Sequence, residues 1–426
     1  MVNINKQYIM KKANSLLSLN RKSTLGGVMT NSKRGFTIVE LLVVIVVIGI
    51  LAAITIVSYT GITSRATVAS LTSDLDNASK QLKLYQVEHN AFPASLQTST
   101  NCPQDSTTPT PIVDTNYCLK SSSGNTLAYS STNTTTFALT ATNITTNTAY
   151  GLNNTSSPVA LAQPTSCPTG FIPVPGSSTY GTAGFCVMKY AASQVGATNV
   201  PTSVPSVLPW VNISQTTAIA NSPNVANCTG CHLWTEAEYM TIAQDVLNVA
   251  SNWSTGTVGS GYIYSGHNDN VPANALAPDS NDANGYYGET NQGGNQRRTL
   301  TLSNGQVIWD MAGNVWEWTA GQTNGTTAQQ PGISGNGWNW REWPTVTTPG
   351  SLTINPFPSG TGLSGANTWN SGKGVGQIYS NSDNTGLYGF LRGGAWSGGG
   401  YAGVLTLGLS SGPGYSGNGI GFRVSR

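Results

Sequence analysis

The densest group of reactive side chains in the sequence is Cys-Thr-Gly-Cys-His at residues 228–232. Two thiols separated by two residues and followed by a histidine form the attachment motif of c-type haem. The thiols would bond to the haem vinyl groups and His232 would ligate the iron, with Met240 or His267 as the sixth ligand. The simpler alternative for the same residues is a disulfide within the motif.

A second group of candidate residues lies at 396–420, close to the C-terminus. Tyrosine gives rigid contact area, while serine, glycine and asparagine give adaptable hydrogen bonding, and recognition loops use this composition. The alternative is a flexible low-complexity loop, but the apolar residues of 404–409 predict a core strand that would hold the segment in place. We therefore expect a ligand-binding face made of Trp396, Ser397, Tyr401, Ser410, Ser411, Tyr415, Ser416 and Asn418.

One charged residue, Glu40, interrupts an apolar run at 36–57. A helix of that length rises about 33 Å at roughly 1.5 Å per residue, enough to cross a hydrocarbon core. An ionised group inside such a helix costs about 2.5–3.5 kcal/mol on insertion scales, so a carboxylate there is expected to have a partner. The plain alternative is a single-pass anchor in which the charge is accidental.

The residues before and within this run, Lys-Arg-Gly-Phe-Thr-Ile-Val-Glu at 33–40, resemble the class III signal of type IV prepilins. The resemblance implies that a prepilin peptidase cuts after Gly35 and that Phe36 becomes the first, methylated residue. It also implies that Glu40 pairs with the new N-terminal amine of a neighbouring subunit. The expected partners are thus other pilin subunits, the prepilin peptidase and the membrane. The expected location is the bacterial cell surface or a pilus, after anchoring in the cytoplasmic membrane.

The composition is that of an exported protein. Charged residues make up 8% of the chain, against roughly 25% in soluble domains. The leader at 1–35 holds 7 basic residues and no acidic one, so the rest has 19 − 7 = 12 basic against 17 acidic residues, net −5. Since no basic patch remains, no nucleic-acid partner is expected.

Cysteines of an exported chain are expected to form disulfides. The sequence alone permits many connectivities for six cysteines. Proximity in the sequence favours pairing Cys102 with Cys118, Cys167 with Cys186, and Cys228 with Cys231.

The expected elements follow from periodicity. Apolar residues recur at three- and four-residue steps from Val68 to Tyr85, one stripe of an amphipathic helix that Pro93 ends. A further helix is expected at 235–249, with a capping box of Thr235 and Glu238. The fold class is α+β. Its expected parts are a leader at 1–35, a transmembrane and assembly helix at 36–93, a small β head at 94–153, a linker at 154–165 and a second domain at 166–426.

Segments of the second domain resemble, in order, the formylglycine-generating-enzyme (sulfatase-modifying factor) family, a variant of the C-type lectin-like fold. They are Phe-Cys-Val-Met-Lys-Tyr (185–190), His-Leu-Trp-Thr-Glu-Ala-Glu-Tyr (232–239), Trp-Asp-Met-Ala-Gly-Asn-Val-Trp-Glu-Trp (309–318), Leu-Arg-Gly-Gly-Ala-Trp (391–396) and Gly-Ile-Gly-Phe-Arg-Val (419–424). The resemblance implies a C-type lectin-like domain. It also offers an explanation for His232 other than haem ligation, because this histidine begins the second of these segments.

The resemblance also implies a calcium ion in the segment 309–318. Its ligands would be the side chains of Asp310 and Glu317 and the carbonyls of Gly313 and Val315, hard oxygens of the kind calcium prefers. The alternative is that the tryptophans of this segment are core and that the two carboxylates cap the backbone or pair with Arg392. A second acidic group, at 267–270 with Asp279 and Asp282, is a weaker candidate for an ion than for a solvated loop.

Catalysis is not expected. Enzymes of that family bind copper through paired cysteines in the C-terminal segment, and no cysteine follows Cys231 here. A shared fold without the ligands does not transfer the activity.

The segment 396–420 is also similar to the variable region of lectin-fold proteins diversified by retroelements, in which randomised AAC-type codons place serine, glycine, tyrosine and asparagine on a constant apolar frame. We thus expect a type IV pilus-like subunit that displays a lectin-like domain for adhesion or recognition of an extracellular protein or glycan. The alternatives are a filament subunit that carries c-type haem for electron transfer and a structural pseudopilin of a secretion or DNA-uptake system.

Overall fold

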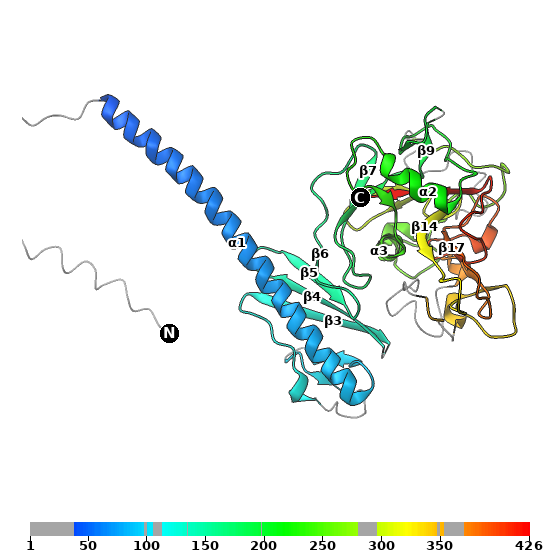
Figure 1. Cartoon of the computed structure of the whole chain (residues 1–426), viewed down its shortest axis with the longest axis horizontal. Coiled ribbons are helices and arrows are strands. Elements are labelled where there is room, and N and C mark those ends of the chain that lie inside the picture. Colours follow the sequence, from blue (N-terminus) through cyan, green and yellow to red (C-terminus); the bar gives the residue numbers. More distant parts are fainter. Residues whose placement is uncertain are drawn as a thin grey trace, which may run out of the picture. The chain divides into compact units, whose positions relative to one another are not determined.

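The expected α+β class is confirmed: one long helix precedes largely β structure (Figure 1). The computed structural model describes residues 38–97, 100–104, 113–133, 135–196, 198–279, 296–346, 350–352 and 370–426. It contains two compact units, Met1–Ile62 and Thr63–Arg426. Gly35, Phe36 and Asp282, named above as candidates, lie outside the described residues, and Glu40 lies within the first helix.

The first helix, α1, runs over Ile38–His89, close to the expected 36–93. It contains no proline and only two glycines, at 49 and 61. Asn90 adopts a positive φ of 56°, a left-handed conformation that commonly ends helices. Among the residues that the structure describes, no helix is both long and apolar enough to span a membrane, so the expected transmembrane helix is not confirmed.

The part of α1 after residue 62 packs on a small antiparallel sheet of order β3-β4-β5-β6 (Figure 1). Its strands are β3 (Asn125–Asn133), β4 (Thr136–Asn143), β5 (Ala149–Asn153) and β6 (Val159–Ala160). Leu71, Leu75, Ala78 and Leu82 of the predicted stripe are buried against Phe92, Phe137, Leu139 and Leu152. Because β6 lies inside the expected linker at 154–165, that segment forms the edge strand of the sheet as well as a connection.

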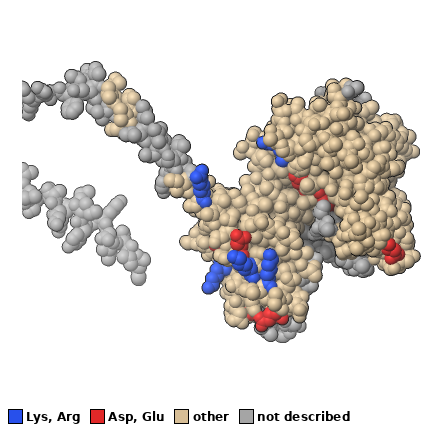
Figure 2. Space-filling model, in the orientation of Figure 1, with Lys and Arg blue, Asp and Glu red and all other residues tan. Residues whose placement is uncertain are grey.

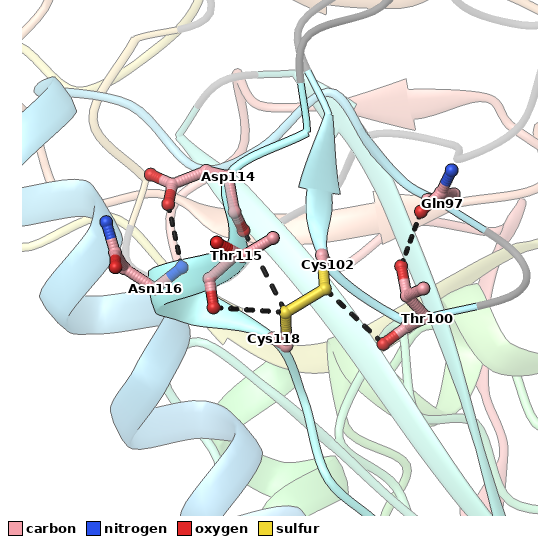
Figure 3. The surroundings of a disulfide bond; sticks show 7 residues. All are labelled: Gln97, Thr100, Cys102, Asp114, Thr115, Asn116 and Cys118. Atoms are coloured by element: carbon pink, nitrogen blue, oxygen red, sulfur yellow. Dashed lines mark hydrogen bonds between the residues drawn. A yellow bond between two sulfur atoms is a disulfide. The ribbon is translucent and has the colours of Figure 1, made fainter.

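The loops of this head are fixed by a disulfide and by one buried carboxylate. Cys102 and Cys118 are joined, and Thr100 and Thr115 lie beside the bridge (Figure 3). The segment also holds β1 (Ser95–Leu96), β2 (Pro103–Gln104) and a 3-10 turn at Thr115–Tyr117. Asp74, 5% exposed on α1, accepts hydrogen bonds from the backbone and side chain of Ser122 and from Asn125, at 2.7–2.9 Å.

The C-terminal domain has two principal sheets, of order β11-β20-β8-β7 and β15-β16-β18-β17-β14-β19, and two small ribbons, β9 with β10 and β12 with β13. Its strands are β7 (Phe171–Val174), β8 (Phe185–Met188), β9 (Ser193–Gln194), β10 (Pro201–Thr202), β11 (His232–Leu233), β12 (Thr299–Thr301), β13 (Val307–Trp309), β14 (Trp316–Gln322), β15 (Asn339–Arg341), β16 (Ile378–Ser380), β17 (Gly389–Arg392), β18 (Leu407–Gly408), β19 (Ile420–Phe422) and β20 (Val424–Ser425). Only 407–408 of the expected strand at 404–409 is regular strand. Its apolar residues are nevertheless fully buried, so they do form core.

In the described part of this domain, α-helices form at α2 (Gln215–Asn221) and α3 (Glu236–Leu247). The expected capping box is present: the Thr235 side chain accepts from Glu238 N, and the Glu238 carboxylate accepts from Thr235 N. The three expected disulfides are confirmed, Cys102–Cys118, Cys167–Cys186 and Cys228–Cys231.

Candidate ligand-binding face

A cleft of about 420 Å³ lies over one face of the six-stranded sheet. Every strand of that sheet contributes a residue to its lining, and the loops after β17 and β18 complete it. The lining residues are Trp316, Trp340, Tyr379, Leu391, Ala395, Trp396, Ser397, Gly408, Ser410, Ser411, Tyr415, Gly417, Asn418, Gly419 and Ile420.

Strand register explains why these distant residues meet. Trp316 pairs with Ile420, Leu391 with Gly408, Gly408 with Tyr379, and Tyr379 with Trp340, across four different strand pairs. Partners in register place their side chains on the same face of a sheet. The floor of the cleft is therefore a row of aromatic and apolar side chains, and the Trp316 ring lies 3.5 Å from the position that a Cβ at Gly408 would take.

Aromatic rings continue this row. The Trp340 ring stacks on Tyr401, with centroids 4.6 Å apart and an interplanar angle of 11°. It lies 5.0 Å from Tyr379 and 6.4 Å from Trp316, to which it is nearly parallel at 19°. Trp338 stacks on Tyr379 in turn, at 5.7 Å. Sequence reasoning missed Trp316, Trp340 and Tyr379 as site residues. The alternating Trp-Asn-Trp at 338–340 was the available signal.

Six of the eight residues expected to bind ligand line the cleft: Trp396, Ser397, Ser410, Ser411, Tyr415 and Asn418. Tyr401 stacks behind Trp340 without lining the cleft, and Ser416 is exposed beside it. Tyr401 and Tyr415 are 47% and 56% exposed, whereas Leu407 and Leu409 between them are fully buried. The structure thus places exposed residues of the expected ligand-binding face next to buried apolar residues that hold them in position.

The loops that border the cleft are tied to the scaffold by backbone hydrogen bonds. Gly389 N donates to Ser411 O at 2.9 Å, and Asn212 N donates to Gly417 O at 2.9 Å. The side chain of Gln330, 2% exposed, donates to Leu409 O and accepts from Asn381 N. A cleft held in this way is largely formed before a ligand arrives.

The cleft is electrically neutral. None of the described lining residues is an aspartate, glutamate, lysine, arginine or histidine. Residues 393–422 contain no charged residue at all. Charge is sparse on the protein in general, and most of the surface visible in Figure 2 belongs to neither basic nor acidic side chains.

Trp396 lies at the wall of the cleft. Its indole Nε1 is buried and, within the described part of the chain, has no hydrogen-bond partner. An unpaired buried donor costs roughly 1–3 kcal/mol.

The residues expected to bind calcium do not fit that ion. Both carboxylate oxygens of Asp310 accept from Arg298, at 2.8 and 2.7 Å, and both of Glu317 accept from Arg423, at 3.0 and 2.8 Å. The carbonyl of Gly313 accepts from Val315 N at 2.9 Å. A bidentate guanidinium already occupies each carboxylate and supplies the positive charge that calcium would bring.

The partners of these carboxylates are not Arg392, the alternative partner considered from the sequence. Arg392 instead pairs with the buried Glu236 of α3. In the described segments no group of three or more His, Cys, Asp or Glu side chains is arranged to hold a metal ion. The second acidic group is also engaged, since His267 Nδ1 lies 3.3 Å from Asp269.

The haem motif does not fit haem either. Cys228 and Cys231 are bonded to each other, so neither thiol is available for a vinyl group. His232 Nε2 lies 3.2 Å from both carboxylate oxygens of Glu238, and Ser425 Oγ donates to the same carboxylate at 2.8 Å. The hydrogen bond to Glu238 raises the pKa of His232, against the effect of partial burial.

These features define an α+β protein with a pilin-like N-terminal segment and a C-terminal domain that carries an uncharged, aromatic cleft. Residues 30–56 match the prokaryotic N-terminal methylation motif. The chain is 41% identical over 64 residues to the type IV wide pilus major component PilA4 of Thermus thermophilus, covering 15% of this chain and 48% of that protein. It is 32% identical over 69 residues to the type II secretion system core protein G of Dickeya chrysanthemi, covering 16% and 45%. The chain thus spans about half the length of these curated relatives.

Solved structures with some likeness to the chain include Treponema denticola variable protein 1, with 16% identity and a TM-score of 0.28, covering 64% of this chain and 96% of that one. Another is the Major Tropism Determinant U1 variant, with 14% identity and a TM-score of 0.25, covering 65% and 62%.

Proposed function

We propose that this chain is a pilus-like surface subunit whose lectin-like C-terminal domain binds an extracellular ligand, for recognition or adhesion rather than catalysis. The observation that carries the proposal is the cleft, where residues of recognition-loop composition stand on one face of a sheet with all six strands contributing. The methylation motif supports processing by a prepilin peptidase, anchoring in the cytoplasmic membrane and assembly with other pilin subunits.

The second candidate is a structural pseudopilin, favoured by the similarity to secretion core proteins over the N-terminal segment. That segment is shared by both kinds of relative, so it does not separate the two functions. A purely structural cap gains nothing from an open, preformed cleft with exposed tyrosines at its rim, and the cleft therefore favours recognition.

Filling the cleft tests the proposal. A Cβ at Gly408 would lie 3.5 Å from the Trp316 ring and 3.7 Å from Leu391, ordinary contact distances, so Gly408→Leu projects its side chain onto the cleft floor. Cells whose filaments carry this variant should adhere to target cells or surfaces several-fold less than the wild type, while filament number stays the same. Thr326→Leu, at an exposed turn residue away from the cleft, is the matched control. Equal adhesion of all three would contradict recognition through this face.

We further propose that this face is diversified by a retroelement. The support is the arrangement of exposed serine, tyrosine and asparagine on a buried apolar frame. Sequencing the gene in sister clones should reveal adenine-directed changes confined to codons 397–419. Identical sequences in all clones would leave a fixed receptor.

A further inference from the structure

We propose that the cleft binds an uncharged saccharide, with a sugar ring lying against Trp340 and its hydroxyl groups bonded by the surrounding loops. This rests on the recognition function proposed above and names its ligand class. The proposal rests on two features that lie next to each other in the cleft. One is a platform of nearly parallel aromatic rings, and the other is a rim of hydroxyl and amide side chains. None of the described lining residues is charged.

The absence of charge decides which ligands fit. A carboxylate, phosphate or ammonium group that entered this cleft would lose water and find no opposite charge among the described lining residues, and uncompensated desolvation of an ion is strongly unfavourable. The sequence extends the point beyond the lining, because 393–422, which includes most of the lining residues, contains no charged residue. Acidic sugars, phosphopeptides and polyamines are therefore disfavoured.

The aromatic platform favours a flat partner with apolar faces. Trp316 and Trp340 are nearly parallel, and Tyr401 stacks on Trp340 without lining the cleft, which holds that indole in place. The face of an aromatic ring carries negative potential. The axial C–H bonds on one face of a pyranose are weakly positive, so this face packs on an indole with both apolar contact and weak C–H interactions.

The rim of the cleft supplies hydrogen-bond donors and acceptors for the hydroxyl groups at the edge of a sugar ring. Ser397, Ser410 and Ser411 each offer a donor and acceptors, and the Asn418 amide offers both as well. Sugar hydroxyls also donate and accept, so these groups can satisfy one another without charge. Gly408 lies between Leu391 and Tyr379 in the strand register and adds no side chain of its own to the cleft.

A protein partner is the competing ligand class. Recognition loops of this composition also bind proteins, but protein interfaces are enriched in arginine, which is frequent among their anchor residues. None of the lining residues that the structure describes carries a charge to match an arginine, which favours the saccharide.

The test is binding of the full chain, in detergent micelles, to an array of neutral oligosaccharides, sialylated and sulfated oligosaccharides, and deglycosylated proteins. We expect binding to a subset of the neutral oligosaccharides alone.

Trp340→Ala should weaken the affinity for these oligosaccharides by roughly tenfold or more, about 1.4 kcal/mol or above. Trp340→Phe, which keeps a ring, should retain most of the affinity. Tyr262→Ala, which removes a half-buried ring that does not line the cleft, is the matched control. Near-ultraviolet circular dichroism shows whether each variant is folded.

The outcomes separate the two proposals. A preference for acidic glycans, no binding to any neutral glycan, or equal binding by Trp340→Ala would overturn the saccharide inference. Trp340-dependent binding to a deglycosylated protein would overturn it as well, while supporting recognition through the same face. Undiminished adhesion of Gly408→Leu filaments would instead remove the recognition function itself.

Discussion

Arg298, Arg392 and Arg423 are each buried in the C-terminal domain, and each binds a buried carboxylate. Two of these carboxylates, Asp310 and Glu317, belong to the segment whose family resemblance implies calcium. Arg423 also donates to the carbonyls of Met188, Lys189 and Trp309, so one guanidinium ties together the backbone of two separate segments. Such a residue holds the two segments together through its own hydrogen bonds.

Calcium should therefore have no effect on stability. Addition of calcium or of a chelator should leave the melting temperature of the full chain unchanged, because arginine already neutralises both carboxylates. Glu317→Gln, in contrast, should lower the free energy of unfolding by about 3–5 kcal/mol, since it leaves the buried guanidinium of Arg423 without its counter-charge and with one acceptor fewer. Urea denaturation measures this, with Asp76→Asn on the exposed face of α1 as the control. A melting temperature that rises with calcium would restore the metal site.

His232 should make stability depend on pH. Its pKa is raised in the folded protein by the hydrogen bond to Glu238. The pKa of Glu238, which burial alone would raise, is lowered by His232, Thr235 and Ser425. The stabilisation from protonated His232 is fully present below its ordinary pKa of about 6.5 and is lost as the pH rises through the raised value. The melting temperatures of wild type and His232→Gln should differ more at pH 5.5 than at pH 9. An equal difference at both would show that the pair does not act through charge.

At the scale of elements, the packing of α1 on the head was partly predictable. The stripe of Leu71, Leu75 and Leu82 follows from helical periodicity, and all three are buried. Asp74 lies within the same stripe and was not predicted, because its role depends on a loop about 50 residues later in the chain. Local periodicity finds a buried face, but it does not reveal which polar residue on that face has a distant partner.

Asp74 should be the residue that fixes the head on the helix. Asp74→Asn replaces one carboxylate oxygen with an NH2 group, which cannot accept the hydrogen bonds that Asp74 Oδ2 accepts from Ser122 N and the Asn125 side chain. We expect a loss of about 1–3 kcal/mol in the free energy of unfolding. Asp76→Asn, two residues away and exposed, should change it little. Denaturant titration that shows equal effects of the two variants would contradict this role.

The cleft was also only partly predictable: local composition indicates one half of it, whereas strand pairing determines the other half. Residues 396–420 have a recognition-loop composition that is visible in one stretch of sequence. Trp316, Trp340 and Tyr379 come from three separate strands, and only the parallel pairs β14 with β19 and β16 with β18 bring them beside that stretch. Pairing between strands that are not consecutive in the sequence depends on the tertiary fold, and short-range sequence patterns do not specify it. The aromatic half of the site was missed for that reason.

At the scale of the whole molecule, assembly and binding are assigned to different units. Glu40 lies in Met1–Ile62, and every lining residue of the cleft lies in Thr63–Arg426. The first unit carries the methylation motif at residues 30–56. A change in one unit should therefore leave the other function intact.

The final prediction separates the two functions with one pair of variants. Glu40→Ala removes the carboxylate proposed to pair with a neighbouring subunit's N-terminal amine, so filaments should be strongly reduced or lost in electron micrographs. The same variant, purified in detergent, should bind array ligands as the wild type does, because its cleft is unchanged. Gly408→Leu should show the reverse, normal filaments and weakened binding. If Glu40→Ala abolished ligand binding by the solubilised chain, the ligand face would depend on the N-terminal unit, and the assignment of separate functions to the two units would be wrong.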